Sequence, residues 1–501
     1  MKEACMSHTR FPLRLLTAVA AATLLAACST LAPDYERPVS VVPDAWAATP
    51  AAATATTAGD RSAATAAVPA VDTLGWQEFI ADDKLRRVIA LALRNNRDLR
   101  VSTLNVERLQ ALYQVQRADL MPSINAGVGQ SAQRTPGDLN GTGQSTISRQ
   151  YSGTVGISAY ELDLFGRVRS LKDAALMQYL ATEQAQRSAQ ISLVSQVSVA
   201  YMTLAADRER LSLAEQTLQS RRETLRLTQR MHELGVSSAL ELRQVQSTVD
   251  SARADVASYS SVVAQDLNAL TVLVGAPVAS DLLPTAISSA ALTLTQDLSA
   301  GLPSDVLLRR PDVQQAEKSL EAANANIGAA RAAFFPSISL TASTGYASTD
   351  LNNLFKSDQR SWSFVPQLNI PIFSGGRNRA NLRVSELDRD IAVAQYEKAI
   401  QTAFKEVSDA LAQRATLGEQ TAAQEALAAS TLDAFRLARA RYEKGIDDYL
   451  STLDAQRSSY TAQQALISAR LAQQVNRVTV YKVLGGGASQ ESAAAPVMPK
   501  G

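Results

Sequence analysis

Two long segments without glycine or proline constrain the fold of this chain more than any other feature. The first runs between Gly166 and Gly235 and contains 68 residues. One apolar side chain recurs at every seventh position within it: Val197, Leu204, Leu211, Leu218 and Leu225. A single helix of this length would extend for roughly 100 Å, far beyond the helices of ordinary globular domains. Its apolar seam predicts that it packs lengthwise against another, nearly parallel helix.

The second segment has the same dimensions. It also contains 68 residues, between Gly376 and Gly445, and is interrupted only by Gly418. After each segment comes a return stretch of 39 residues, 236–274 or 446–484, again without glycine or proline. We therefore expect two equal helical hairpins, with the turns at Gly235 and Gly445, because glycine accepts the left-handed conformation that ends a helix. Shorter helices are expected upstream, at about 82–121 and 312–335.

The equal dimensions come from an internal repeat. RADLMPSI at 117–124 returns as RAAFFPSI at 331–338, and Val274-Gly275 returns as Leu484-Gly485. The matches keep their order along the chain, so most of the chain is a tandem duplication of a unit about 210 residues long.

A different period separates the helical segments. Residues 337–343, SISLTAS, have an apolar side chain at every second position, and so do 124–128 and 155–159. On the return of the second pair, Trp362, Phe364, Leu368, Ile370 and Ile372 share one face. Period two with one apolar face indicates half-buried strands, two in each repeat. Such strands fit a membrane barrel, with a soluble sheet packed on a core as the alternative.

Four strands are too few to close a membrane barrel, which takes about eight or more. Open strand edges in lipid would leave backbone groups without hydrogen bonds, so two or more copies are expected to share one barrel. The aromatic residues Tyr160, Phe165, Trp362 and Phe373 are candidates for the membrane interfaces. Pro371 is expected at or beyond the membrane boundary.

The first residues have the pattern of an export signal. Arg10 and Arg14 precede a 13-residue apolar run that is too short to span a bilayer. Leu25-Ala26-Ala27-Cys28 resembles a bacterial lipobox, which implies an S-diacylglycerol and an N-palmitoyl group on Cys28; Ser29 favours the outer membrane. The alternatives are an ordinary cleaved signal with an incidental cysteine, and a start at Met6 in place of Met1.

Composition excludes several classes of function. Removal of residues 1–27 takes away three basic residues and one acidic residue, so the formal charge changes from +1 to about −1. A nearly neutral protein is not expected to bind nucleic acid. Cys28 and His232 are the only cysteine and histidine left, which argues against metal sites, cofactors and histidine-based catalysis. No GxxxxGK[ST], HExxH or GxSxG motif occurs, so we expect no enzyme.

The amino-acid sequence resembles that of a known family, the TolC-type outer-membrane factors, and within it the OprM-like (NodT-type) lipoproteins. The resemblance covers nearly the whole mature chain and rests on these stretches: PDYERP at 33–38, NNRDLR at 95–100, ELDLFGR at 161–167, LPSD at 302–305, RAAFFPSISL at 331–340 and LDAQR at 453–457.

The resemblance implies an α+β membrane protein that forms a homotrimer. Three chains would share a 12-stranded outer-membrane β-barrel and build a long periplasmic α-helical barrel. It implies a passive duct for drugs and small toxic compounds, joined by a periplasmic adaptor to an inner-membrane pump of the resistance-nodulation-division type. Alternatives are a duct for type I protein secretion or metal efflux, and a lipoprotein scaffold without a pore.

The family pattern also implies a gate at the second helix tip. Leu450 would form an apolar ring and Asp454 an acidic ring around the pore. Arg441, Tyr442 and Arg457 would tether neighbouring helices in the closed state. Ordinary surface pairing between Asp454 and Arg457, three apart on a helix, is the alternative.

The expected organisation follows from these features. It comprises a signal peptide (1–27), a lipidated extended segment (28–81), a first repeat (82–290), a second repeat (291–486) and a disordered tail (487–501).

Overall fold

The computed structural model describes residues 30–39, 41–44, 46, 74–139, 141, 143–286 and 304–488. These residues form two compact units, each of which draws on both copies of the repeat. The first unit takes its described residues from 1–38, 106–182 and 316–396, and the second from 39–105, 183–315 and 397–501. Most of the predicted tail, like Cys28 and the predicted signal peptide, lies outside the described residues.

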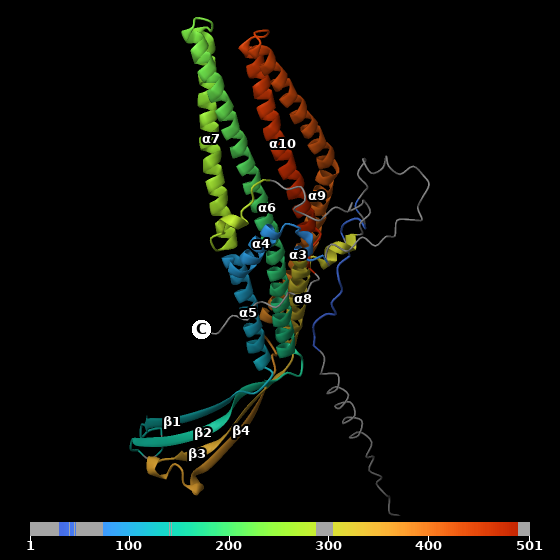
Figure 1. The fold of residues 1–501 in the computed structure, drawn as a ribbon. Coiled ribbons are helices and arrows are strands. Elements are labelled where there is room, and N and C mark those ends of the chain that lie inside the picture. The colour runs from blue at the N-terminus through green and yellow to red at the C-terminus, as the bar shows by residue number, and fades with distance from the viewer. Residues whose placement is uncertain are drawn as a thin grey trace, which may run out of the picture. The chain divides into compact units, whose positions relative to one another are not determined.

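Helices dominate the chain (Figure 1). Their bounds are α3 Trp76–Phe79, α4 Asp83–Asn95, α5 Arg97–Ala118, α6 Arg167–Glu233, α7 Ala239–Val274, α8 Pro311–Ala332, α9 Arg377–Glu443 and α10 Tyr449–Val483, with short 3-10 turns η1 Ser280–Leu282, η2 Ser304–Arg309, η3 Leu351–Asn353 and η4 Ser357–Gln359. The long helices α6 and α9 have 67 residues each, and α5 and α8 have 22 each. The predicted duplication is thus confirmed in the lengths of the elements.

One predicted helix is divided. The sequence favoured a single helix at about 82–121, but α4 ends at Asn95 and α5 begins at Arg97. Asn96 adopts an extended conformation between them, with ψ 129°. Its side-chain oxygen accepts a hydrogen bond from the Leu99 backbone N–H at 2.8 Å, as the N-cap of a new helix does. The break is therefore made by a capping asparagine, with no proline or glycine involved.

The first unit contains one antiparallel sheet of four strands, as predicted. The strands are β1 Ile124–Thr135, β2 Thr146–Leu162, β3 Ser337–Ser348 and β4 Arg360–Asn369, paired in the order β1-β2-β3-β4. The strands β1 and β4 are therefore the two edges. Pro366 lies inside β4, where an edge strand tolerates a residue without N–H, and Pro371 lies beyond its end.

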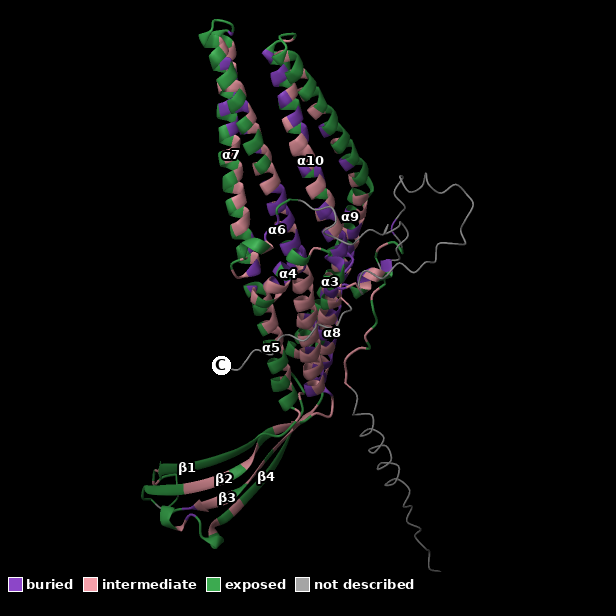
Figure 2. Ribbon diagram, viewed as in Figure 1, coloured by how far each residue is buried: buried purple, intermediate pink, exposed green. Residues whose placement is uncertain are grey.

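The register separates the sheet into one apolar and one polar face, because directly paired residues lie on the same side. Ile124 pairs with Ile157, Ile157 with Ala342, and Ala342 with Phe364. The opposite face carries mainly Ser, Thr, Asn and Gln side chains and glycines, with Val365 and Ala347 among them. The edge strands β1 and β4 are exposed over almost their whole length (Figure 2). The alternative of a soluble sheet packed on a core of this chain is therefore wrong.

A β-bulge keeps this separation intact toward the end of β2. The register shifts between Ile157 and Tyr160, and Ala159 has a φ of 50°. The bulge places Tyr160 on the apolar face and sends Glu161 to the polar face. The predicted alternation through Ala159 is wrong at that residue for this reason.

The ELDLFGR stretch ties the end of β2 to the start of α6. The Arg167 guanidinium donates to both carboxylate oxygens of Glu161, at 2.8 and 2.5 Å. Asp163 accepts from the backbone N–H and the side chain of Arg169 at 2.9 and 3.1 Å. The motif thus neutralises the first arginines of the long helix at the point where strand becomes helix.

The segment 30–38, expected to be part of a lipidated extended segment, is docked along α8. The Arg37 guanidinium donates to Glu317 at 2.7 Å, and the Asn324 amide donates to the Pro33 carbonyl at 2.7 Å. A Cβ on Gly328 would lie 2.7 Å from the backbone nitrogen of Ala32. The glycine therefore makes room for the close approach of this segment.

The helices of the second unit pack along the predicted apolar seam. Val197 and Leu204 of α6 are fully buried, Leu218 is buried, and Leu211 and Leu225 are half-buried. Leu218 belongs to a cluster with Val249 and Ala252 of α7, which joins the two arms of the first hairpin. The seam is therefore a packing surface, as predicted.

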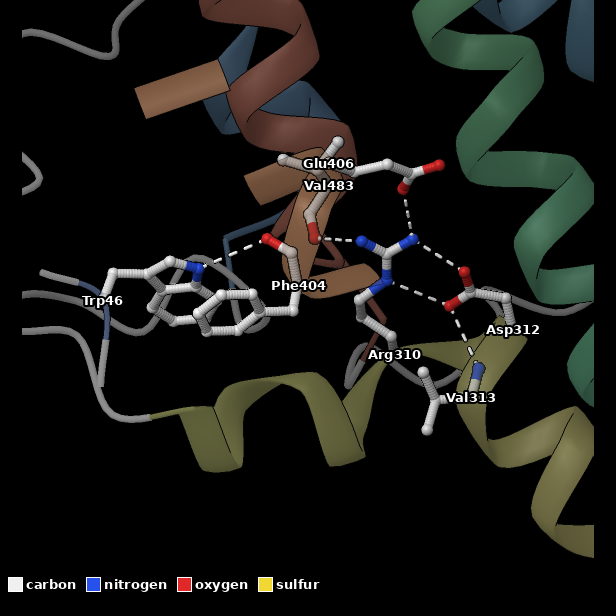
Figure 3. A network of polar contacts seen from close by, with 7 residues as sticks. All are labelled: Trp46, Arg310, Asp312, Val313, Phe404, Glu406 and Val483. Carbon is white, nitrogen blue, oxygen red and sulfur yellow. Dashed lines mark hydrogen bonds and ion pairs between the residues drawn. The ribbon is translucent and has the colours of Figure 1, made fainter. Parts of the chain in front are cut away.

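A buried arginine closes the base of the second hairpin (Figure 3). Arg310, just before α8, donates to the Val483 carbonyl at the end of α10 at 2.8 Å, to both oxygens of Asp312, and to Glu406 of α9 at 2.7 Å. Burial lowers the pKa of Arg310, but the hydrogen bonds and charges of Asp312 and Glu406 raise it more, so the net shift is upward. The guanidinium stays charged and fully paired.

The first repeat builds the same joint without charge. The Asn96 amide, just before α5, donates to the Leu273 carbonyl in the last turn of α7 at 2.8 Å. Asn96 and Arg310 thus bind corresponding carbonyls, 210 positions apart, in the two repeats. A neutral amide fulfils in one repeat the role that a charged guanidinium fulfils in the other.

Candidate functional site: the two helix tips

Each long hairpin of the second unit turns at a glycine in the left-handed region. Gly235 has a φ of 76° and Gly445 a φ of 72°. The N–H of each glycine bonds to the carbonyl three residues before it, and the N–H of the next residue bonds to the carbonyl five residues before that one, at 2.9 Å in all four bonds. This is the Schellman arrangement, which satisfies the last carbonyls of α6 and α9. The sequence therefore placed both turns.

The return helices start with side-chain caps. Ser238 accepts from the Glu241 N–H at 3.1 Å at the start of α7, and Asp448 accepts from the Ser451 N–H at 3.0 Å at the start of α10. The Ser451 bonds lower the pKa of Asp448. The second tip thus carries a fixed negative charge where the first has a neutral serine.

Arg441 lies within the second tip. Its guanidinium makes a bidentate ion pair with Asp447 across the turn, with distances of 2.6 and 2.9 Å. The hydrogen bond to the guanidinium is the main cause that lowers the pKa of the Asp447 carboxyl. Arg441, predicted as a tether between neighbouring helices, therefore braces its own turn in the single chain.

Tyr442 connects the two hairpins. Its hydroxyl, on α9, donates to Glu241 of α7 at 3.0 Å, and the Ser237 hydroxyl donates to the other oxygen of the same carboxylate at 2.7 Å. Burial, followed by the hydrogen bond to Glu241, raises the pKa of Tyr442 to about 12. The phenol therefore remains a hydrogen-bond donor at physiological pH.

An apolar cluster supports this hydrogen bond. Val245 of α7 packs with Tyr449 and Leu453 of α10, and Tyr442 covers the cluster. The rings of Tyr442 and Tyr449 meet edge to face, with centroids 5.6 Å apart. The two tips of one chain are thus joined by a small core with one charged hydrogen bond at its rim.

The predicted gate residues lie on another face of α10. Leu450, Asp454 and Arg457 follow one another at spacings of four and three, and all three are exposed. The Arg457 guanidinium is 4.0 Å from the Asp454 carboxylate, and both side chains are more than half exposed. Such a pair contributes little to stability, so this stripe is available to other molecules.

Sequence reasoning missed the partners that complete the site. Glu241 accepts the hydrogen bonds of Tyr442 and Ser237, and Asp447 pairs with Arg441. One signal for Glu241 was present: Ser238 followed three residues later by Glu241 is a capping-box sequence. The carboxylate binds the tyrosine of the other hairpin, which no local pattern indicates.

The comparison with protein families decides the identity of this architecture. The family model described as outer membrane efflux protein matches residues 88–276 and 302–486. The chain belongs to the outer membrane efflux protein family. The fold predicted from the resemblance, long helices with four strands per chain, is thereby confirmed.

Relatives within the outer membrane efflux protein family span almost the whole chain. The antibiotic efflux pump outer membrane protein ArpC and the toluene efflux pump outer membrane protein TtgC, both from Pseudomonas putida, are each 49% identical over 474 residues, which cover 94% of this chain and 95% of theirs. The open-state structure of the MtrE outer membrane channel of Neisseria gonorrhoeae matches with a TM-score of 0.81 at 37% identity and covers 93% of this chain and 100% of that one.

Proposed function

We propose that three copies of this chain form an exit duct in the outer membrane. Drugs and other small toxic compounds enter it from an inner-membrane pump of the resistance-nodulation-division type through a periplasmic adaptor, and leave the cell without chemical change. One observation carries the proposal. The four-stranded sheet has one apolar face and one polar face, and both of its edge strands are exposed.

The sheet supports a shared barrel on physical grounds. In hydrocarbon, each edge strand would leave a row of N–H and C=O groups without partners. Three copies contribute twelve strands, enough to close a barrel. The polar face would then line water and the apolar face would contact lipid, which accounts for the alternation along every strand.

The relatives support efflux as the role of the duct. ArpC and TtgC carry antibiotic efflux and toluene efflux in their names, and this chain matches both over 94% of its length. Export of proteins or of metal ions would use the same architecture, so the cargo is an outcome of the test below.

The gate would lie at the inner end of the helical barrel. Three exposed Leu450 side chains and three Asp454 carboxylates, related by the trimer axis, would narrow the pore and concentrate cations there. Arg441, Tyr442 and Arg457 would hold the helices in the closed arrangement. The Glu241–Tyr442 bond supports this proposal, because it already joins two hairpins within a chain.

The lipid anchor is proposed at Cys28, with diacylglycerol on sulfur and palmitate on nitrogen. The motif at residues 25–28 supports it, and so does the docked segment that begins two residues later and binds α8 through Asn324 and Glu317. Mass spectrometry of the N-terminal peptide, with Cys28→Ser as the control, tests the modification.

The proposed duct is tested in two steps. The purified protein should migrate as a trimer that dissociates on heating, and it should conduct ions in planar bilayers. A deletion strain should then become sensitive to toluene and antibiotics and recover with the wild-type gene. A monomer that conducts nothing would overturn the duct and favour a scaffold. Sensitivity confined to metal salts, or loss of a secreted protein, would replace drugs as the cargo.

A further inference from the structure

The charged residues of the four strands are few and unevenly placed. Arg134 in β1, Arg149 in β2 and Arg360 in β4 are the only basic residues of the sheet, and Glu161 is its only acidic residue. All three arginines lie near the hairpin ends of their strands, and Glu161 lies at the end where β2 joins α6. The sheet thus has one strongly basic end.

The register places the three arginines on the apolar face. Arg134 pairs with Ile147, Arg149 pairs with Ala132, and Arg360 pairs with Tyr346. Positions 132 and 134, like 147 and 149, are two residues apart and therefore share a side. The same face carries Ile124, Val128, Val155 and Phe364, which lie farther from the hairpin ends. At the hairpin ends this apolar face therefore carries a row of guanidinium groups.

Aromatic rings flank this row. Tyr151 pairs with Ser348 and Tyr346 with Arg360, and Trp362, two residues beyond Arg360, is 77% exposed. Tyrosine and tryptophan with arginine beyond them mark the boundary between hydrocarbon and headgroups in membrane barrels. From Ile124 to Arg134 the strand rises roughly 33 Å, or about 25 Å across the membrane at a tilt of about 40°.

The guanidinium groups are available. All three arginines are exposed, and among the residues that the structure describes none forms an ion pair with a carboxylate. The Arg134 guanidinium donates to the Ser145 hydroxyl at 3.2 Å.

The loops at this end carry Asp138, Asp350 and Asp358. Asp350 accepts from the Asn352 N–H and Asp358 from the Gln359 amide, and in the described part of the chain neither of these carboxylates forms an ion pair with the three arginines. The guanidinium groups can therefore bind an anion from outside the protein.

From this geometry we infer that Arg134, Arg149 and Arg360 form a binding row for the phosphate groups of a glycolipid in the outer leaflet. The apolar band below them would contact its acyl chains. Arginine suits this role because its planar fork binds phosphate in a bidentate manner. The inference rests on the proposed function, which puts the hairpin ends of the strands at the outer surface.

The test measures lipid retained by the full-length trimer. Detergent-purified protein is incubated with bisphosphorylated lipid A, with dephosphorylated lipid A or with phosphatidylglycerol, and bound lipid is counted by native mass spectrometry. We expect the wild type to retain bisphosphorylated lipid A selectively. The triple variant Arg134→Gln, Arg149→Gln, Arg360→Gln should retain it about a hundredfold more weakly, since it removes three arginines that each contribute about 1 kcal/mol near a charged lipid surface.

A face-swapped variant separates a site from net charge. Gln133→Arg, Gln150→Arg and Ser361→Arg, added to the triple variant, restore the charge on the polar face and should not restore retention. Equal retention by the wild type and the triple variant, equal retention of dephosphorylated lipid A, or recovery in the face-swapped variant would each overturn the inference. If the triple variant fails to assemble, Arg149→Gln alone must still weaken retention.

Conductance distinguishes this inference from the proposed function. Trimers of the triple variant should conduct ions like the wild type, because the arginines lie on the face away from the pore. If the wild-type protein retains phosphorylated lipid A but conducts no ions, the proposed duct is overturned and the proposed lipid-binding row is not.

Discussion

The two helix tips share one backbone arrangement but differ in the side chains at matched positions. Both turn at a glycine in the same left-handed conformation, and both return helices begin with a capping side chain. At corresponding positions, 210 apart, the first tip has Ser238, Gln244 and His232 where the second has Asp448, Asp454 and Tyr442. The backbone is duplicated, whereas the side chains at these three positions are not.

This difference shows how a duplicated hairpin acquires two roles. The second tip carries the carboxylate proposed for the gate and the tyrosine that reaches the other hairpin, and the first tip supplies its acceptor, Glu241. The Glu241 equivalent in the second tip is Ser451, which cannot serve as a charged acceptor. Each tip thus needs the other, and the following predictions compare matched positions.

The largest effect is expected at the proposed gate. The double variant Leu450→Ala, Asp454→Ala should raise the single-channel conductance of the trimer several-fold, because it removes the apolar and acidic rings together. The matched variant Leu240→Ala, Gln244→Ala alters the equivalent residues of the first tip and should leave conductance close to that of the wild type. Equal increases in the two variants would mean that the tips do not differ in this role.

The bond between the hairpins comes next. Tyr442→Phe removes the donor to Glu241 and should cost about 1.5–3 kcal/mol of local stability, as hydrogen bonds to charged groups do. Hydrogen exchange at residues 236–250 and 446–456 should accelerate. His232→Phe changes the equivalent residue of the first tip and should leave exchange at 446–456 unchanged. Unaltered exchange in Tyr442→Phe would show that the apolar cluster alone joins the tips.

Substitution of the glycine should destabilise the two turns equally, because both tips have the same turn geometry. Gly235→Ala and Gly445→Ala should each destabilise their own tip by about 1–2 kcal/mol, the cost of a left-handed residue with a Cβ. A Cβ at either position meets nothing within 4 Å, so no clash adds to this cost. Hydrogen exchange of the last turns of α6 and α9 measures both; a large difference between them would indicate an added role for one turn.

The smallest effect is expected from a carboxyl pair in the first hairpin. Burial, and next the neighbouring Asp207, raise the pKa of Asp266 to about 6, above its value of about 4 in an unfolded chain. The folded state therefore holds an extra proton between these values, and stability from this group falls as pH rises from 4 to 6. Asp266→Asn should flatten this part of the pH profile of thermal unfolding. The wild-type second hairpin already has Asn476 at this position.

A steeper profile in Asp266→Asn would show that Asp266 is charged in the fold. Asn476→Asp is the reciprocal variant. In the wild type the Asn476 amide donates to the Ala410 carbonyl at 2.9 Å, and Leu417 occupies the sequence position equivalent to Asp207. The variant therefore tests the effect of burial without a second carboxyl.

The sequence by itself determined the repeated elements of this protein. The 67-residue helices, their turns at Gly235 and Gly445 and the four strands follow from residue spacing and from the placement of glycine. These features depend on interactions between residues a few positions apart, so a single sequence contains them. The gate residues came from the resemblance and stay a prediction.

Only the tertiary structure decided which side chains meet. Glu241 and Tyr442 are 201 positions apart, and no periodicity links them. The bulge at Ala159 and the row of arginines depend on strand register, where a shift of one residue moves every side chain to the other face. The docked segment at 30–38 depends on the room that Gly328 leaves. Long-range packing selects these contacts, because each requires a partner whose position is set by the rest of the fold.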